Sequence, residues 1–352
     1  MQVGIQFFPD IGPDVRSARD YWQDALSLVA LCDRYDYSHV RTVEHYFHPY
    51  GGYSPNPVVF LAAAAQVTKQ ARLVTGAVLP AFNNPLKLAG ELAMLDALCD
   101  GRLDIGFARA FLPHEFSRFG VKLDESRARF DEGIEQVRLL LENENVTSEG
   151  RFHSFRNVTS LPRPTQQPRP PFYVAALATK ASFEGAGAAG HSIMAIPMAG
   201  SAMAELIGLY REARRRAGYP GGGTVMLAFH MFCHPDQAEA ERIAREPLNR
   251  YLRSLVTAAS DWLQGETSAD YPGYDKIITA LSLETFETQV EKCAAWIGTP
   301  ECILDTVQGY RRLIGDFEIA SLQVNFNDIR FADAQASMHL FGEQVLPRLK
   351  DW

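Results

Sequence analysis

The stretch Thr42-Val43-Glu44-His45-Tyr46-Phe47-His48-Pro49-Tyr50-Gly51-Gly52-Tyr53-Ser54-Pro55-Asn56-Pro57 decides the fold of this chain. It follows a short β-branched and apolar run near residue 40, and it places a carboxylate and two histidines where a predicted strand ends. A loop rich in aromatic residues, glycine and proline comes next. Because α/β barrels carry their chemistry where strands meet loops, the stretch predicts a site at the strand ends of such a barrel.

Segments typical of strands alternate with segments typical of helices along the 352 residues. The expected strands are 3–8, 38–43, 72–79, 102–107, 172–176, 192–196, 225–231 and 320–326. The expected helices are 18–34, 58–67, 85–98, 127–141, 202–216, 237–254, 284–297, 300–314 and 333–349. This alternation predicts a TIM (β/α)8 barrel that forms a single domain over residues 1–352. The alternative is an open doubly wound sheet, but no G-x-G-x-x-G opens a helix after a strand.

Two segments interrupt the alternation. Residues 143–171, after the fourth strand, are rich in Pro, Arg and Gln, and residues 256–283, after the seventh, contain glycine, proline and several tyrosines. Loops of this length inside a compact domain are usually functional. We therefore expect loop insertions after strands 4 and 7, the second of which closes over the site.

Composition excludes several classes of function. The net charge of −8 argues against sequence-independent nucleic-acid binding, which needs clustered cations. No apolar run approaches the roughly 20 residues that span a bilayer, so no membrane association is expected. The five cysteines form no CxxC and no close Cys/His pattern, which predicts no metal site. Together with the absence of a signal peptide, they favour a reduced, cytoplasmic protein.

Polar residues at the predicted strand ends leave alternatives open. Arg109 could anchor an anion, or it could pair structurally with Glu115 or Asp104. The turn from Thr179 to Ser182 opens a helix, so it could bind phosphate, cap the helix, or do both. His45 could be a general base, a hydrogen-bond donor to a reactive group, or a histidine whose role is structural.

These residues belong to segments that resemble the bacterial luciferase-like family of flavin-dependent oxidoreductases, the luciferase-like monooxygenases. The resemblance covers nearly the whole chain. Each segment is moderately specific, and their order and spacing together carry the resemblance. The segments are Glu44-His45-Tyr46-Phe47, Ser54-Pro55-Asn56-Pro57, Val78-Leu79-Pro80, Asn84-Pro85-Leu86, Glu91-Leu92-Ala93-Met94-Leu95-Asp96, Asp100-Gly101-Arg102-Leu103-Asp104-Ile105-Gly106-Phe107-Ala108-Arg109 and Ser126-Arg127-Ala128-Arg129-Phe130.

The resemblance implies a barrel with reduced FMN at its C-terminal mouth. By it, His45 and Glu44 are the expected catalytic residues, with His45 near the flavin. The expected cofactor-binding residues are Gly76, Ala77, Leu79, Arg109, Ala176, Thr179 and Ser182. The expected substrate-pocket residues are Phe8, Tyr46, Tyr53, Phe111 and His114. A strained peptide near Thr75-Gly76 would also fit the family.

The activity that the resemblance implies is that of a two-component monooxygenase. A separate flavin reductase would supply FMNH2, and O2 would oxygenate an organic substrate through a C4a-(hydro)peroxyflavin. Hydroxylation, Baeyer–Villiger insertion and N-oxidation would share this framework, on a small-molecule or carrier-bound substrate. The alternatives are an F420-dependent dehydrogenase and a non-catalytic flavin-binding partner subunit. A homodimer is expected, because the early helices often form a dimer face in this family.

Two positions depart from luciferase itself. The second histidine of its Glu-His-His run is Tyr46 here, and the cysteine beside its flavin is Ala108. The pocket is therefore expected to differ from that of luciferase, and a light-emitting role is not expected.

Overall fold

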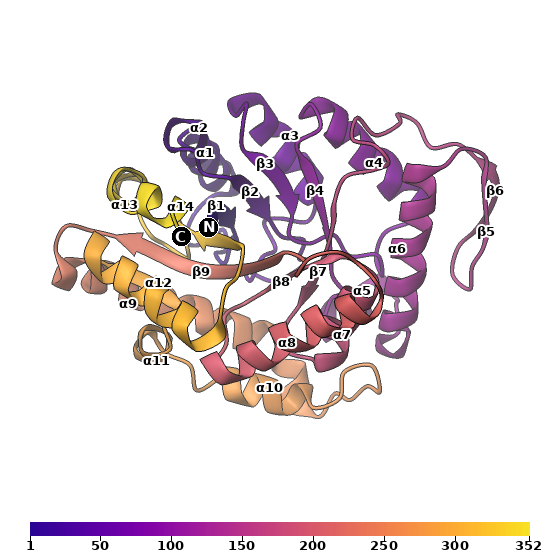
Figure 1. The fold of residues 1–352 in the computed structure, drawn as a ribbon. Helices are drawn as coiled ribbons and strands as arrows, with labels where there is room; N and C mark the ends of the chain where they lie inside the picture. The colour runs from indigo at the N-terminus through magenta and orange to yellow at the C-terminus, as the bar shows by residue number, and fades with distance from the viewer.

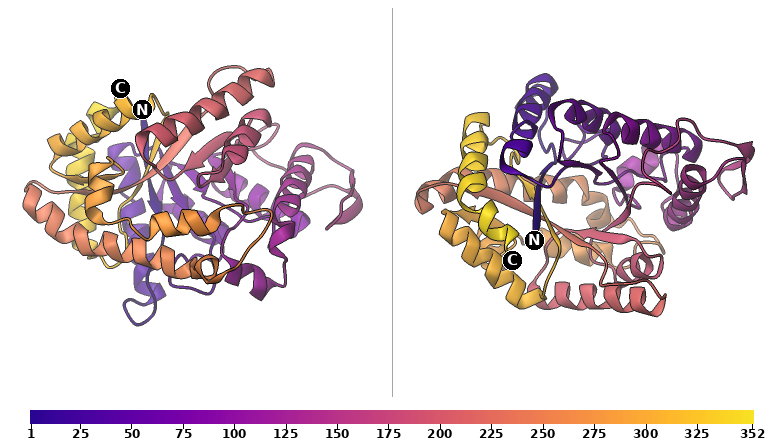
Figure 2. Two further views of the ribbon diagram at one scale, coloured as in Figure 1. Left: turned by 90° about the horizontal axis from the view of Figure 1, so that it is seen from below. Right: turned by 45° about the horizontal axis from the view of Figure 1, so that its top comes forward.

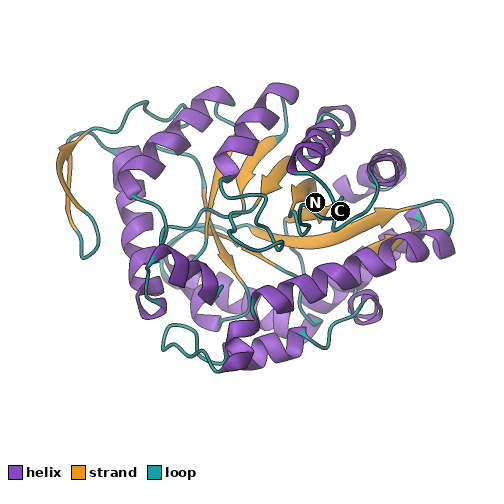
Figure 3. Cartoon of the chain, turned by 180° about the vertical axis from the view of Figure 1, so that it is seen from behind, coloured by secondary structure: helices purple, strands orange, loops and turns teal.

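The computed structural model describes residues 1–352 and contains a closed barrel of eight parallel strands surrounded by helices (Figures 1 and 3). Neighbouring strands pair in the order β11, β1, β2, β3, β4, β7, β8 and β9, and β9 pairs with β11 to close the ring. The strands are β1 (Gln2–Phe7), β2 (His39–Thr42), β3 (Arg72–Thr75), β4 (Leu103–Phe107), β7 (Phe172–Ala176), β8 (Ser192–Ala195), β9 (Val225–Cys233) and β11 (Ile319–Gln323). The predicted TIM barrel is confirmed.

Helices cover the outer face of this barrel (Figure 3). They are α1 (Ala18–Val29), α2 (Cys32–Tyr35), α3 (Pro57–Val67), α4 (Pro85–Leu98), α7 (Lys180–Ala188), α8 (Gly200–Arg216), α12 (Pro300–Ile314), α13 (Phe331–Gln344) and α14 (Leu346–Lys350). No helix is long and apolar enough to cross a membrane.

Asn-Pro pairs begin the helices after β2 and β3. The Asn56 side chain accepts a hydrogen bond from the backbone of Val58, and Pro57 is the first helical residue of α3. The N-terminus of α4 repeats the arrangement with Asn84 and Pro85. Asparagine caps and N1 prolines fix a helix start, so both strand-end loops terminate at defined points.

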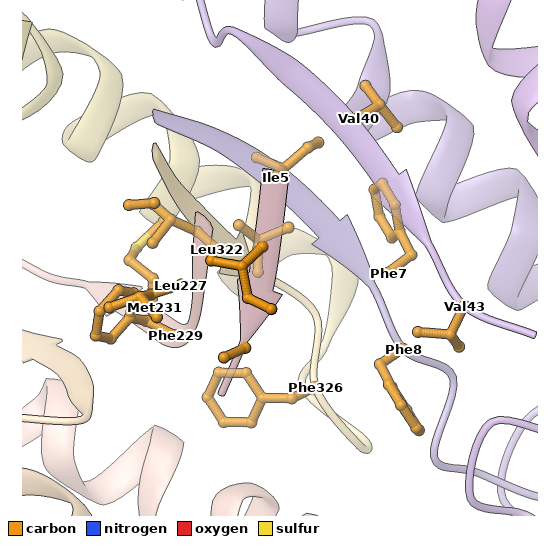
Figure 4. Close-up of a cluster of buried hydrophobic side chains, with 14 of the residues drawn as sticks. Ile5, Phe7, Phe8, Val40, Val43, Leu227, Phe229, Met231, Leu322 and Phe326 are labelled. Carbon is orange, nitrogen blue, oxygen red and sulfur yellow. The ribbon is translucent and has the colours of Figure 1, made fainter. Parts of the chain in front are cut away.

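The two faces of each strand have different chemistry. Side chains that point outward pack against the helices in one hydrophobic core. Figure 4 labels buried residues on β1, β2, β9 and β11, together with Phe8, Val43 and Phe326, which lie just beyond the ends of these strands. Ile5, Phe7, Val40 and Leu322 are fully buried there. Because side chains alternate along a strand, the residues between them point into the barrel lumen, where several polar groups lie.

The predicted insertions 143–171 and 256–283 lie within two longer connections, one between β4 and β7 and one after β9, which are called the first and the second insertion below. Between β4 and β7 lie α5 (Pro113–Phe119), the 3-10 turn η1 (Leu123–Glu125), α6 (Ser126–Glu142) and the hairpin of β5 (Val146–Glu149) and β6 (Ser154–Val158). This hairpin extends away from the barrel in Figure 1. After β9 come α9 (Gln237–Ala258), η2 (Ser260–Gln264), α10 (Tyr274–Leu281), α11 (Phe286–Glu291) and a ninth strand, β10 (Ala295–Gly298).

The expected helix over 284–297 is wrong in its second half. The helix α11 ends at Glu291, and Cys293 has a left-handed backbone with φ 56°, which a continuing helix does not permit. The apolar residues that follow form β10, which pairs in parallel with the end of β9. A buried apolar run of this length suits either structure, so periodicity alone could not separate them.

The chain ends beside its start. The amino group of Met1 donates to the carbonyl oxygen of Leu349 at 3.2 Å. Both views in Figure 2 show the two termini side by side.

Candidate active site

A cavity of about 660 Å³ opens at the C-terminal ends of the barrel strands and reaches into the lumen. Most residues that line it are hydrophobic, with a small number of polar groups among them, as in typical cofactor sites. Its walls include Phe8, His45, Gly76, Ala77, Leu79, Arg109, Phe111, Ala176, Thr179 and Ser182. With Glu44, which also lines the cavity, the barrel brings eleven of the fourteen sequence-predicted site residues to one space.

His45 is held by a buried carboxylate from the first insertion. Its Nδ1 lies 3.1 Å from Oε1 of Glu115, and the same oxygen accepts a hydrogen bond from the backbone of Tyr46 at 2.8 Å. Glu115 is fully buried on α5, and its Oε2 has no hydrogen-bond partner. A carboxylate acceptor at Nδ1 fixes the proton there when the ring is neutral, which leaves Nε2 free for a ligand.

Aromatic rings surround the imidazole of His45. The ring centroids of Phe8 and Tyr50 each lie 5.4 Å from it, and Phe111 contacts it edge-on at 6.1 Å. These apolar neighbours restrict water around Nε2. The arrangement suits a proton donor or acceptor that acts in a dry pocket.

Glu44 is a buried residue of the cavity lining and holds the loop after β3. It accepts hydrogen bonds from the Tyr46 hydroxyl at 2.6 Å, Asn83 Nδ2 at 2.9 Å and the Leu79 backbone at 3.1 Å. Burial raises the pKa of Glu44 to about 7 in spite of these three donors. All three donors belong to the protein. The contacts of Glu44 therefore indicate that it positions the backbone of Leu79 at the cavity wall.

The backbone after β3 approaches the lumen closely. The peptide bond between Gly76 and Ala77 is cis, one residue beyond the expected position. A Cβ added to Gly76 would lie 2.0 Å from Nε of Arg41, so only glycine fits there. Gly76 and Ala77 therefore present main chain and small side chains to the cavity, and Leu79 adds an apolar side chain.

Arg109 lies at the mouth of the cavity. It pairs with neither Glu115 nor Asp104, because Glu115 binds His45 and Asp104 binds Arg72. Its Nη1 donates to the carbonyl oxygen of Asp270 at 2.9 Å, and its guanidinium lies 4.6 Å from the ring of Tyr271. With no carboxylate partner, Arg109 keeps charge available for an anion.

The N-terminus of α7 lines the cavity as well. Thr179 is its N-cap residue, but its hydroxyl contacts Ser182 Oγ at 2.7 Å and does not cap the helix. The side chain of Lys180 turns away and pairs with Glu205. The first turn of a helix attracts anions, and these two hydroxyls add polar groups beside it.

Three expected pocket residues lie outside the cavity, which corrects the sequence prediction. Tyr46 packs among phenylalanines and donates to Glu44, because its hydroxyl finds a buried acceptor there. The Tyr53 hydroxyl donates to the carbonyl oxygen of Arg16 at 2.8 Å. His114 lies beside His48, with Nε2 3.3 Å from the carbonyl oxygen of Tyr46.

The second insertion supplies wall residues that the sequence did not single out. They are Tyr251, Leu252 and Leu255 from α9 with Tyr274, Ile277, Ala280 and Leu281 from α10. The segment expected to close over the site does line it.

The sequence suggested Glu115 only as a partner for Arg109. Glu115 lies in the first turn of a helix that starts at Pro113, and this position does not show from sequence that its side chain faces His45.

Comparison with known proteins identifies the family of the chain. The family model for the luciferase-like monooxygenases matches residues 1–316. The chain belongs to this family. The resemblance stated from its sequence is therefore confirmed, and its site can be compared with those of other luciferase-like monooxygenases.

The relatives are named as monooxygenases or as oxygenating components of monooxygenases, and two of the three names include a flavin. The oxygenase component of the flavin-dependent trigonelline monooxygenase of Acinetobacter baylyi is 31% identical over 96% of this chain and 92% of its own length. The crystal structure of the monooxygenase RslO1 from Streptomyces bottropensis is 42% identical, with a TM-score of 0.89, over 99% of this chain and 100% of that one. The oxygenating constituent of 3,6-diketocamphane monooxygenase from Pseudomonas putida, solved with FMN, has the same fold at 20% identity and a TM-score of 0.83, over 99% and 98% of the two chains.

Proposed function

We propose that this luciferase-like protein is a flavin-dependent monooxygenase that uses reduced FMN, supplied by a separate reductase, and O2 to oxygenate an organic substrate. The observation that carries the proposal is His45, whose Nδ1 is held by buried Glu115 while its Nε2 is free at the wall of an apolar cavity. The similarity to the oxygenase component of a flavin-dependent monooxygenase supports a two-component enzyme, in which a separate reductase provides the reduced flavin.

The residues of the cavity fit FMN. Arg109, Thr179 and Ser182 at the start of α7 would hold the phosphate, because a guanidinium and a helix N-terminus both attract anions. Gly76, Ala77 and Ala176 offer a surface without bulky side chains on which a flat ring can lie, and Leu79 adds an apolar side chain. Because a Cβ at position 76 would overlap the side chain of Arg41, this position stays glycine, and no side chain there covers the surface.

When bound, reduced FMN would supply the activation of O2 for transfer of one oxygen atom to the substrate. The chain would bind the cofactor, exclude water and handle protons. Phe8, Tyr50 and Phe111 would keep solvent from the reacting oxygen. His45 Nε2 would donate a proton to that oxygen or accept one from it, while Glu115 holds the ring in place.

The substrate side is mostly apolar and aromatic. Tyr251, Leu252 and Leu255 of α9 and Tyr274 of α10 line it, which favours a medium-sized organic molecule or a carrier-bound one. The free Nε2 of His45 fits hydroxylation, Baeyer–Villiger insertion and N-oxidation equally.

A homodimer is also proposed. The early helices expose large apolar side chains, namely Val59 and Val67 on α3 and Leu86, Met94 and Leu98 on α4. Exposed apolar patches of this kind mark association surfaces. Sedimentation of the wild type should give a dimer and Met94→Lys should favour the monomer, whereas a monomeric wild type would refute the dimer.

The experiment that tests the function compares cofactors. Under anaerobic conditions the protein is titrated with FMNH2 and with reduced F420, and each complex is then exposed to O2. Tight binding of FMNH2 together with reoxidation by O2 that is slower than that of free FMNH2 supports the monooxygenase. Preferential binding of reduced F420 without oxygen uptake would replace it with the dehydrogenase. Binding of FMNH2 without any effect on its reoxidation would favour a non-catalytic partner subunit.

A further inference from the structure

Four polar side chains form a continuous row around one half of the barrel lumen. His230 on β9 lies opposite Gln323 on β11, Gln323 lies opposite Gln6 on β1, and Gln6 lies opposite Arg41 on β2. Directly paired residues of parallel strands point to the same side of a sheet. All four residues line the cavity, and we refer to them as the polar row.

The other half of the lumen carries small or apolar residues. Gly76 follows β3, Ala108 follows β4 and Ala175 lies on β7, and all three line the same cavity. Such a lumen complements a flat ring with one polar edge. The ring faces would contact the small residues, and the polar edge would meet the polar row.

Several atoms of the polar row have no partner in the protein. Arg41 Nε, Gln323 Oε1 and His230 Nε2 are buried and form no hydrogen bond. Gln323 is 0% exposed and Arg41 is 9% exposed. Buried polar groups are nearly always satisfied, so a row of unpaired ones along a cavity indicates a ligand with matching donors and acceptors.

Arg41 is a buried cation without a carboxylate. Its Nη1 donates to Gln6 Oε1 and its Nη2 to the carbonyl oxygen of Gly76 at 2.9 Å, and both acceptors are neutral. Burial lowers the pKa of Arg41 to about 10, so it remains protonated at neutral pH. A buried charge normally has a counter-ion, and the cavity is the space from which one can come.

We propose that the polar row binds the pyrimidinedione edge of the flavin ring, and that Arg41 favours the anionic reduced flavin over the oxidised form. The inference rests on the proposed function. This edge presents two carbonyl oxygens on either side of one N–H, and the reduced ring carries its negative charge beside one of those carbonyls. The N–H groups of Arg41 match the carbonyl oxygens and the charge, and Gln323 Oε1 matches the N–H.

The test measures two dissociation constants under anaerobic conditions, one for FMN and one for FMNH2. The full chain is titrated as wild type, Arg41→Met and Arg41→Lys. Arg41→Met should lower the preference for the reduced form about tenfold, because it removes one nearby positive charge. For a two-electron couple this is a fall of about 30 mV in the potential of bound flavin. Arg41→Lys should retain most of the preference.

Two further variants make the result specific. Gln323→Glu leaves Arg41 in place but adds a carboxylate to the polar row, and it should also weaken binding of the reduced form relative to the oxidised form. Arg109→Met is the matched control, since loss of a phosphate contact should weaken both forms by the same factor. Replacement of a buried cation by an apolar residue is often tolerated, so Arg41→Met should fold, which thermal unfolding checks.

An unchanged ratio of the two dissociation constants in Arg41→Met and Gln323→Glu would overturn the inference and leave the proposed function standing. Benzoate binding to the FMN-loaded wild type that is lost in Arg41→Met would also overturn it, because the row would then hold a substrate carboxylate. A wild type that binds neither form of FMN would refute the proposed function itself.

Discussion

The replacement Glu115→Gln tests how the protein positions its histidine. Oε1 of Glu115 accepts from both His45 Nδ1 and the Tyr46 backbone, and the carboxylate is fully buried. Glutamine keeps the shape of the side chain but removes the charge, and its amide can rotate to present N–H groups to these donors. The imidazole then loses the acceptor that fixes its orientation, while the cavity wall stays intact because Glu115 does not line it.

The size of the effect follows from this contact. A hydrogen bond to a charged group contributes about 1.5–3 kcal/mol to stability. If the same free energy is lost from the contact of His45 Nε2 with the reacting oxygen, release of that oxygen and the return of oxidised flavin should be about 10- to 100-fold faster. Affinity for FMNH2 should change less than about twofold, since the expected phosphate and ring contacts are untouched.

The assay mixes protein and anaerobic FMNH2 with oxygenated buffer and follows the return of oxidised-flavin absorbance. Glu115→Gln should shorten the delay before reoxidation about 10- to 100-fold relative to wild type. Asp96→Asn is the matched control, because Asp96 is also fully buried and accepts two hydrogen bonds from Gln166, far from the cavity. A wild-type delay in Glu115→Gln, or an equal loss in Asp96→Asn, would refute the reasoning.

Further variants test individual contacts. Gly76→Ala should destabilise the fold by about 1–3 kcal/mol and lower its Tm, because the new Cβ would overlap the Arg41 side chain; an unchanged Tm would contradict this. Tyr53→Phe should cost about 1 kcal/mol in denaturant unfolding yet leave FMNH2 binding unchanged, since Tyr53 lies outside the cavity; weaker binding would show otherwise. Burial raises the folded-state pKa of Glu44 from 4.5 to about 7, so its contribution to stability is complete below pH 4.5 and is lost as the pH rises through 7. Unfolding scans from pH 5 to 8 should show a smaller decline for Glu44→Gln than for wild type, and identical declines would exclude Glu44 as the cause.

The fold was predictable because local signals agree with the tertiary structure. Most barrel strands are short runs rich in apolar or β-branched residues, and Asn56-Pro57 and Asn84-Pro85 mark helix starts from sequence alone. The helix predicted over 284–297 was wrong near Cys293. A left-handed residue and strand pairing decide the conformation there, and neither leaves a periodic signal in the sequence.

The site was predictable at the strand ends and less so beyond them. His45 and Arg109 follow strands, so the barrel itself determines where they lie. Tyr53 was misplaced because its loop folds back onto α1, where the backbone of Arg16 offers an acceptor. Glu115 and Arg41 gained their significance from contacts between distant parts of the chain, with His45 and with Gly76, and sequence spacing does not encode such contacts.

The most direct test of the proposed function compares wild type with His45→Ala in the same mixing experiment. The account predicts that the wild type holds reduced flavin and delays the return of the oxidised-flavin absorbance after exposure to O2. The delay should shorten strongly in His45→Ala while FMNH2 binding persists. Reoxidation of FMNH2 at the free-flavin rate in both proteins would contradict an oxygen-activating role for the cavity and for His45.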